Sequence, residues 1–133
     1  MDTQQRAVAR QCLEAADNGT MTFPQIIGAL LAAGFDGYLV DLRLAQNTYY
    51  LSSGAGLELV AHADDVAIAP QLDVDAVKSA IREAQTLAPG YTYRGFCRKV
   101  KAAGCAGYLV SFSGRRVLYF GRTAETHVEH FPS

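Results

Sequence analysis

The chain contains almost the same nine-residue phrase twice. "AAGFDGYLV" runs from Ala32 to Val40, and "AAGCAGYLV" runs from Ala102 to Val110, with seven of the nine positions identical. The correspondence at an offset of seventy continues outside the phrase, where Phe23 falls on Tyr93, Ile27 on Cys97, and Tyr49-Tyr50 on Tyr119-Phe120. Two copies are too few for a solenoid, so this repetition predicts a domain made of two units related by a pseudo-twofold axis.

The residue pattern of each copy predicts two helices. In the first copy, a helix from about Gln4 to Ala16 ends at a "DNG" turn. A second helix opens at "TFPQ", where Thr22 is a suitable N-cap and Gln25 stands in the capping-box position. In the second copy, the corresponding helices cover about Asp75 to Leu87 and begin at Thr92.

The repeated phrase is interpreted as a corner between a helix and a strand. Gly34 and Gly104 are expected to supply the left-handed residue that ends a helix and that glycine adopts at little cost. Gly37 and Gly107 are expected to let the chain turn into a strand that begins at "YLV". A hairpin strand and a third strand follow in each copy, at "LAQNTYYL" with "LELVAH" and at "SGRRVLYF" with "THVEHF". The sequence therefore predicts an α+β fold, an internal duplication of an α-α-β-β-β unit with helices packed on antiparallel sheet.

The length and composition predict one domain. The 133 residues divide into repeats at about 3–63 and 73–131, joined by a linker at 64–72 that contains Pro70 and two aspartates. The longest apolar runs are too short to span a membrane. The N-terminus lacks a secretory pattern and the three cysteines form no C-x-x-C pair, so we expect a cytoplasmic protein with free thiols.

The sequence predicts no catalytic residue, cofactor or metal. It contains neither a Walker loop nor G-x-G-x-x-G. The tetrapeptide "HVEH" follows a hairpin and is interpreted as a strand, in which His127 and Glu129 share one face and His130 points away. Zinc needs three or four converging ligands. The cysteines lie on or beside inward apolar stripes, where buried cysteine behaves as a small hydrophobe.

Repeat-related tyrosines are the remaining candidates for a binding site. Tyr49 and Tyr119 lie on strands, where core packing with the hydroxyl at the rim is the default interpretation. If the two sheets meet at the pseudo-twofold, such side chains would line a shared cleft. The candidate ligand-binding residues are Tyr49, Tyr119, Arg115, Arg116, His127 and Glu129.

The two halves of the chain differ in charge. Residues 1–70 carry three basic and eight acidic side chains (−5), and residues 71–133 carry nine basic and five acidic side chains (+4). The spacing predicts an exposed basic face on one second-half helix, formed by Arg94, Arg98, Lys99 and Lys101. In one interpretation, this face is solvated or pairs with the acidic half of the chain. In the other, it contacts an anionic protein or binds nucleic acid weakly. Free edges on two three-stranded units also predict a homodimer.

Three phrases together resemble a known family. "AAGCAGYLV", "VLYFGR" and "HVEHFP" are similar to the bacterial family named domain of unknown function 1398, and the resemblance covers nearly the whole chain. It implies a small duplicated α+β protein with no established activity and no assigned functional residues. Some members are encoded by prophages and labelled "phage envelope protein", a label that carries no function over to this chain.

Two hypotheses of function follow. The first is a non-enzymatic binding or interaction module. The alternative is a small ligand-binding protein or enzyme that uses a tyrosine, arginine and histidine cleft between the repeats.

Overall fold

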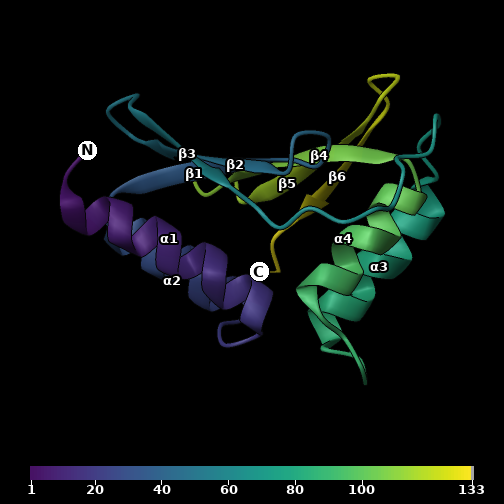
Figure 1. The fold of residues 1–133 in the computed structure, drawn as a ribbon, viewed down its shortest axis with the longest axis horizontal. Coiled ribbons are helices and arrows are strands. Elements are labelled where there is room, and N and C mark those ends of the chain that lie inside the picture. Colours follow the sequence, from purple (N-terminus) through teal and green to yellow (C-terminus); the bar gives the residue numbers. More distant parts are fainter. Residues whose placement is uncertain (133) are drawn as a thin grey trace.

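The computed structural model describes residues 1–132 and shows four helices on one side of a six-stranded sheet (Figure 1). This arrangement confirms the predicted α+β class. The elements are α1 (Thr3–Asn18), α2 (Phe23–Ala32), β1 (Phe35–Asp41), β2 (Gln46–Leu51), β3 (Gly56–Val60), α3 (Val74–Thr86), α4 (Tyr93–Ala102), β4 (Cys105–Ser111), β5 (Arg116–Gly121) and β6 (Thr126–His130).

The sheet is symmetric about its two central strands. Its order is β3-β2-β1-β4-β5-β6, and every neighbouring pair is antiparallel. At the centre, Leu39 of β1 lies opposite Leu109 of β4, with Gly37 opposite Ser111 on one side and Asp41 opposite Gly107 on the other. The order α-α-β-β-β therefore occurs twice along the chain, which fits the expected duplication.

Gly37 and Gly107 are needed for a different reason from the one expected. They lie inside β1 and β4 rather than at a turn before them, and the register of each strand with its hairpin partner shifts just before the glycine. A Cβ at Gly37 would lie 2.5 Å from the Val110 carbonyl oxygen, and a Cβ at Gly107 would lie 2.5 Å from the Val40 carbonyl oxygen. The repeated glycine thus permits close approach across the central strand pair.

Short-range sequence signals set the helix ends. Thr22 caps α2 and accepts a hydrogen bond from the Gln25 backbone N–H, and the Gln25 side chain completes the predicted capping box. Thr92 caps α4, as expected, by accepting a hydrogen bond from the Gly95 backbone N–H. The glycines that follow α2 and α4 adopt positive φ angles, 101° at Gly34 and 92° at Gly104, which confirms the predicted helix ends.

The core lies between the sheet and the helices. Two tyrosine pairs pack there on adjacent strands, Tyr38 with Tyr49 and Tyr108 with Tyr119, each with ring centroids 5.3 Å apart. Burial raises the pKa of Tyr38 and Tyr108 well above the ordinary value. The phenols are therefore neutral side chains of this core.

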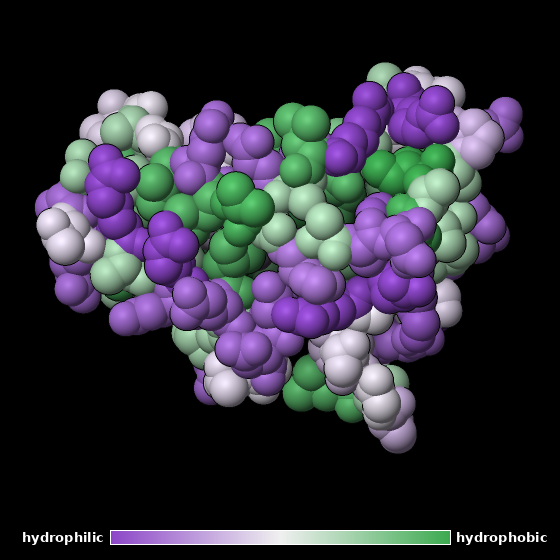
Figure 2. Space-filling model, in the orientation of Figure 1, coloured by the Kyte–Doolittle hydropathy of each residue, from purple (hydrophilic) through white to green (hydrophobic). Residues whose placement is uncertain are grey.

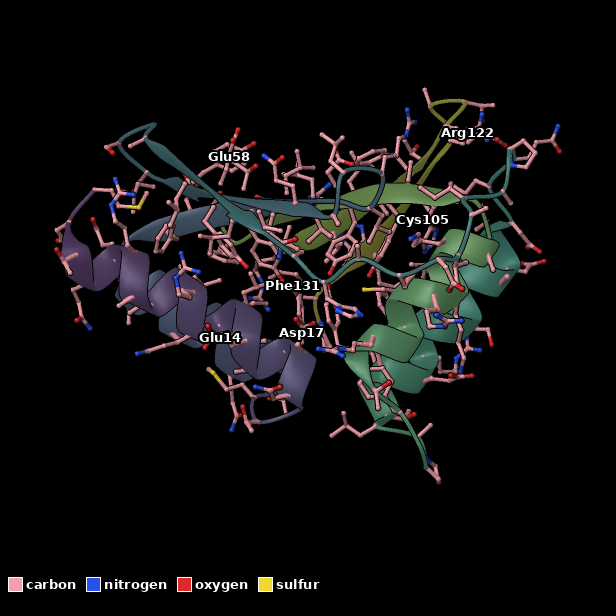
Figure 3. All side chains as sticks on the ribbon, in the orientation of Figure 1. Glu14, Asp17, Glu58, Cys105, Arg122 and Phe131 are labelled. Carbon is pink, nitrogen blue, oxygen red and sulfur yellow. The ribbon has the colours of Figure 1, made fainter. Side chains whose placement is uncertain are left out.

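The helices leave the opposite face of the sheet uncovered (Figure 1). Leu109 and Val128 are partly exposed on that face, in one row with Leu39 and Leu118. Figure 3 shows Glu58 above the sheet and Phe131 below it, between the helix pairs. From this side, apolar residues form a band at the level of the sheet, while the helices present mostly hydrophilic ones (Figure 2). No helix among residues 1–132 combines the length and apolarity that crossing a membrane requires.

The two three-stranded units are joined within one chain. The sequence predicts free edges on each unit, but β1 and β4 pair with each other, so the outer edges of the sheet are β3 and β6. A homodimer stays a prediction. If two copies pair through strand edges, the edges that this sheet offers are β3 and β6.

The two helix-ending glycines allow a matched test of backbone strain. A Cβ at Gly34 would meet the Gln5 side chain at 3.4 Å, so Gly34→Ala should cost about 1 kcal/mol through its positive φ alone. A Cβ at Gly104 would lie 2.0 Å from the Gln71 carbonyl oxygen, so Gly104→Ala should cost about 4 kcal/mol or prevent folding. Chemical unfolding measures both; equal losses would contradict this packing of the linker against α4.

Candidate functional site

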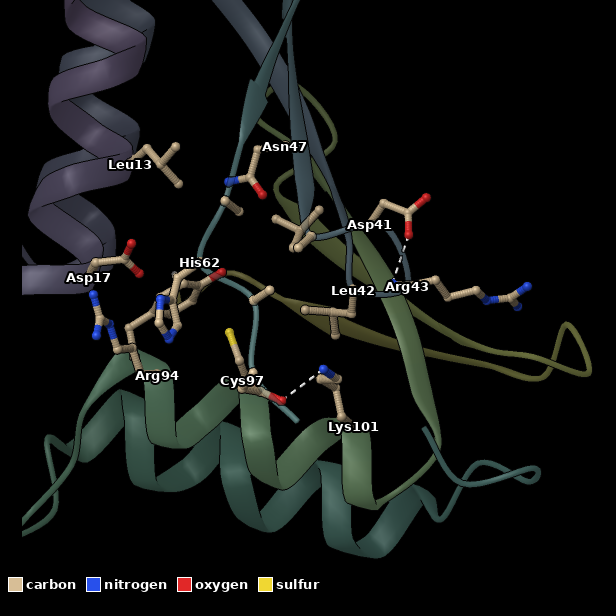
Figure 4. A pocket seen from close by; sticks show the side chains of 16 residues that line it. Leu13, Asp17, Asp41, Leu42, Arg43, Asn47, His62, Arg94, Cys97 and Lys101 are labelled. Carbon is tan, nitrogen blue, oxygen red and sulfur yellow. Dashed lines mark hydrogen bonds and ion pairs between the residues drawn. The ribbon is translucent and has the colours of Figure 1, made fainter. Parts of the chain in front are cut away.

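A cavity of about 90 Å³ lies where the two halves of the chain meet (Figure 4). Its walls come from the end of α1, the β1–β2 hairpin, the segment that follows β3, and one side of α4. Its sixteen lining residues therefore come from both halves. Those on which the site depends are Asp17, Asn47, His62, Arg94, Cys97 and Lys101.

Asn47 is the most unusual residue of the cavity. It lies on β2 opposite Val40 of β1 and is only 4 % exposed. Its Nδ2 donates to the Tyr49 hydroxyl at 3.1 Å, whereas its Oδ1 is buried without a partner among the described residues. Figure 4 shows the amide at the cavity wall, across from Cys97. A buried acceptor without a donor costs about 1–3 kcal/mol, so this oxygen requires an explanation.

Lys101 and Asp64 form an ion pair at one end of the cavity. Lys101 Nζ lies 2.9 Å from Asp64 Oδ1, and the two side chains are about one-tenth exposed. Burial alone would raise the pKa of Asp64, but the hydrogen bonds from Lys101 and from the Val66 N–H outweigh it and lower that pKa. The sequence predicts an exposed Lys101, and this is wrong because the segment after β3 covers that side of α4 and brings Asp64 to it.

Cys97 contributes an uncharged thiol. Burial raises its pKa to about 12, although a hydrogen bond with the Tyr93 side chain acts in the opposite direction. The Tyr93 hydroxyl also lies 2.6 Å from the Tyr108 hydroxyl, which ties α4 to β4. Because the thiolate is the nucleophilic form, this cysteine is suited to hydrogen bonding rather than to covalent chemistry near neutral pH.

Two charged side chains, Asp17 and Arg94, flank the mouth of the cavity, and neither forms an ion pair with another residue among 1–132. Asp17 lies in the last turn of α1, which contains no basic residue, and Arg94 lies in the first turn of α4, which contains no acidic residue. Each side chain has the same sign as the dipole of its own helix end. Figure 4 shows both beside His62, and no ion pair joins them within the described part of the chain. The mouth thus offers an anionic and a cationic group side by side.

The corresponding place in the other half is apolar. An offset of seventy pairs Asn47 with Val117, Cys97 with Ile27, Lys101 with Leu31, and Ala61 with Phe131. There, Phe131 packs edge to face on Phe23, with ring centroids 5.9 Å apart. Sequence reasoning missed the cavity because it compared the copies where they agree. The signal that could have found the cavity was the set of positions at which one copy has a polar residue and the other copy has an aliphatic one.

The predicted ligand-binding residues lie elsewhere. Tyr49 and Tyr119 are buried under the sheet, and Tyr49 reaches the cavity only through Asn47. His127 and Glu129 share one face of β6, as expected for a strand, and form a pair at 3.0 Å. The two hairpin arginines bond to nearby carbonyl oxygens: Arg115 to Pro132 and Arg116 to Gly114. None of these six residues lines the cavity among residues 1–132, and their role in binding stays a prediction.

The predicted basic face is largely paired. Arg98 lies 3.4 Å from Asp65, Lys99 contacts Glu83, and Lys101 contacts Asp64. Two of these partners belong to the acidic first half. Contact of this face with an anionic protein or nucleic acid stays a prediction. Within residues 1–132, no three His, Cys, Asp or Glu side chains gather closely enough to hold a metal ion.

The buried ion pair gives a testable dependence of stability on pH. Lys101→Met should lower the free energy of unfolding at pH 7 by about 2 kcal/mol, less than for a fully enclosed pair because Asp64 keeps some solvent contact. The control Lys99→Met removes an exposed pair and should cost less than about 1 kcal/mol.

The pH dependence follows from the lowered pKa of Asp64 in the folded chain. Its contribution is present above the unfolded pKa of about 3.9 and is lost as the pH falls through the folded pKa. Unfolding curves should therefore show the gap between wild type and Lys101→Met closing below about pH 4. A gap that is constant with pH would contradict the assigned pair.

Comparison with known proteins places the chain in a family. None of the curated proteins matches it. Residues 21–129 match the family described as a protein of unknown function (DUF1398). This match covers most of the chain, including α2 and all six strands apart from the last residue of β6. The chain therefore belongs to the DUF1398 family of proteins of unknown function.

Proposed function

We propose that this protein is a non-enzymatic binding module that holds a small polar molecule in the cavity between its two halves. The observation that carries the proposal is the buried Oδ1 of Asn47, which faces the cavity and has no donor within residues 1–132. The counterpart position holds Val117, so the fold accepts an aliphatic residue at this place in the sheet. A bound molecule that donates a hydrogen bond to Asn47 Oδ1 would explain why an amide is present at this buried position.

The state of the polar groups supports binding rather than catalysis. A nucleophile is normally activated by an adjacent base or a lowered pKa. Burial instead raises the pKa of Cys97 to about 12. The ammonium group of Lys101 is paired with the Asp64 carboxylate, so it is not free to activate a nucleophile. These features favour a site that fixes a ligand through hydrogen bonds and charge.

Stability of the empty protein tests whether Asn47 serves the fold or the ligand. The double variant Asn47→Val/Tyr49→Phe replaces the amide and its hydroxyl partner by apolar groups, so it should be at least as stable as wild type. The control Val117→Asn places an amide at the apolar counterpart and should cost about 2 kcal/mol. Denaturant unfolding measures the free energy of unfolding of both variants. A loss of more than about 2 kcal/mol in the double variant would show that Asn47 has a structural role.

Titration of small probes tests binding directly. Acetamide, ethylene glycol and acetate, added separately to ¹⁵N-labelled protein, should be followed through the backbone amide signals of Ala61 and Cys97 and the side-chain amide of Asn47. At least one neutral probe should give saturable shifts confined to the cavity, and Asn47→Val/Tyr49→Phe should lose them. Four non-hydrogen atoms supply at most about 6 kcal/mol, so the titration extends into the millimolar range. Shifts that are absent for all three probes would refute the proposal.

A further inference from the structure

We infer that the ligand is a free α-amino acid with a carboxamide side chain, glutamine or asparagine. The carboxamide enters the cavity and meets Asn47, and the ammonium and carboxylate groups stay at the mouth with Asp17 and Arg94. This inference rests on the proposed function and adds the chemical class of the molecule bound.

The charges at the cavity favour a molecule with no net charge. Three acidic and three basic side chains line it, of which Lys101 and Asp64 neutralise each other. The remaining two acidic residues, Asp17 and Asp41, balance the remaining two basic ones, Arg43 and Arg94. A phosphate or a polyamine would bring several charges of one sign to a site where neither sign is in excess.

The two helix ends at the mouth match the two ends of a zwitterion. Carbonyl groups at the C-terminal end of α1, together with Asp17, attract a cation. N–H groups at the N-terminal end of α4, together with Arg94, attract an anion. The ammonium and carboxylate of an α-amino acid are attached to one carbon atom, and Figure 4 shows Asp17 and Arg94 on the same side of the cavity.

The interior selects an uncharged polar group. Leu13, Val40 and Cys97 line the cavity around the Asn47 amide, and burying a charge among such groups without a partner is costly. A carboxamide supplies an N–H donor for Asn47 Oδ1 and a carbonyl acceptor for a nearby donor such as the Cys97 thiol. A hydroxyl side chain would satisfy Asn47 but would leave much of the space empty.

The volume agrees with a side chain of this size. One water molecule needs about 10–15 Å³ measured in this way, so 90 Å³ accommodates several waters or one short side chain. An aromatic ring system of nucleobase or indole size exceeds the room beside Asn47. The cavity therefore fits the end of an amino acid rather than a nucleotide or a cofactor.

Calorimetric titration with matched amino acids tests the inference. L-Glutamine and L-asparagine are the ligands, L-glutamate is the charged analogue of nearly equal size, and L-norleucine is the apolar one. At least one carboxamide should bind about tenfold or more tightly than L-glutamate and L-norleucine, because only the carboxamide donates to Asn47 without burying a charge. Equal binding of all four would overturn the assignment of the side chain.

Paired variants test the mouth and the interior separately. Asp17→Asn and Arg94→Met should each weaken the carboxamide ligand about tenfold. The controls Glu14→Gln on α1 and Arg98→Met on α4 remove exposed charges outside the cavity and should leave affinity unchanged. Asn47→Val/Tyr49→Phe should remove the preference over L-glutamate. Unchanged affinity in both Asp17→Asn and Arg94→Met would overturn the zwitterion assignment.

Failure of this inference is distinguishable from failure of the proposed function. If acetamide or ethylene glycol gives saturable shifts at the cavity while no carboxamide amino acid binds, the cavity binds a ligand of another class and the inference is wrong. If none of the three small probes gives saturable shifts, both are wrong, and ordered water fills the space around Asn47.

Discussion

The backbones of β1 and β4 approach each other closely at the centre of the sheet, and the missing side chains of Gly37 and Gly107 allow it. This single strand pair converts two three-stranded units into one sheet. It also fixes where the helix pairs lie, because α2 and α4 lead directly into β1 and β4. The end of α1 and the side of α4 are thereby brought to the same junction, and the cavity between them exists because of this central contact.

The polar groups under the sheet are mostly uncharged. Burial raises the pKa of the phenols Tyr38, Tyr93 and Tyr108 and of the Cys97 thiol, so they pack as neutral side chains with a hydrogen-bonding end. The buried charges of Lys101 and Asp64 lie at the junction and neutralise each other. In this setting Asn47 Oδ1 is conspicuous, because within residues 1–132 it is the one fully buried side-chain nitrogen or oxygen atom without a hydrogen-bond partner.

Local sequence signals predicted the fold well but not the site. Thr22, Thr92, Gly34 and Gly104 act within one or two turns of a helix, so their roles could be inferred from neighbouring residues alone. The pairing of β1 with β4 joins residues about seventy positions apart, and periodicity does not report such a contact. The burial of Lys101 likewise depends on a distant segment, the chain after β3. The helical spacing of residues within α4 alone therefore predicted an exposed side chain.

Antiparallel pairing of β1 with β4 has a consequence for how such a molecule can arise and diverge. The register is symmetric about Leu39 and Leu109, so the same strand pairing is compatible with two identical half-length chains related by a twofold axis, which would have two equivalent junctions. Any substitution would then change both junctions at once. Covalent linkage removes that restriction: Phe23 and Phe131 pack together at one junction, while polar groups line a cavity at the other. Within one chain, the two places can therefore differ, and here one is packed with aromatic rings while the other is lined by polar side chains.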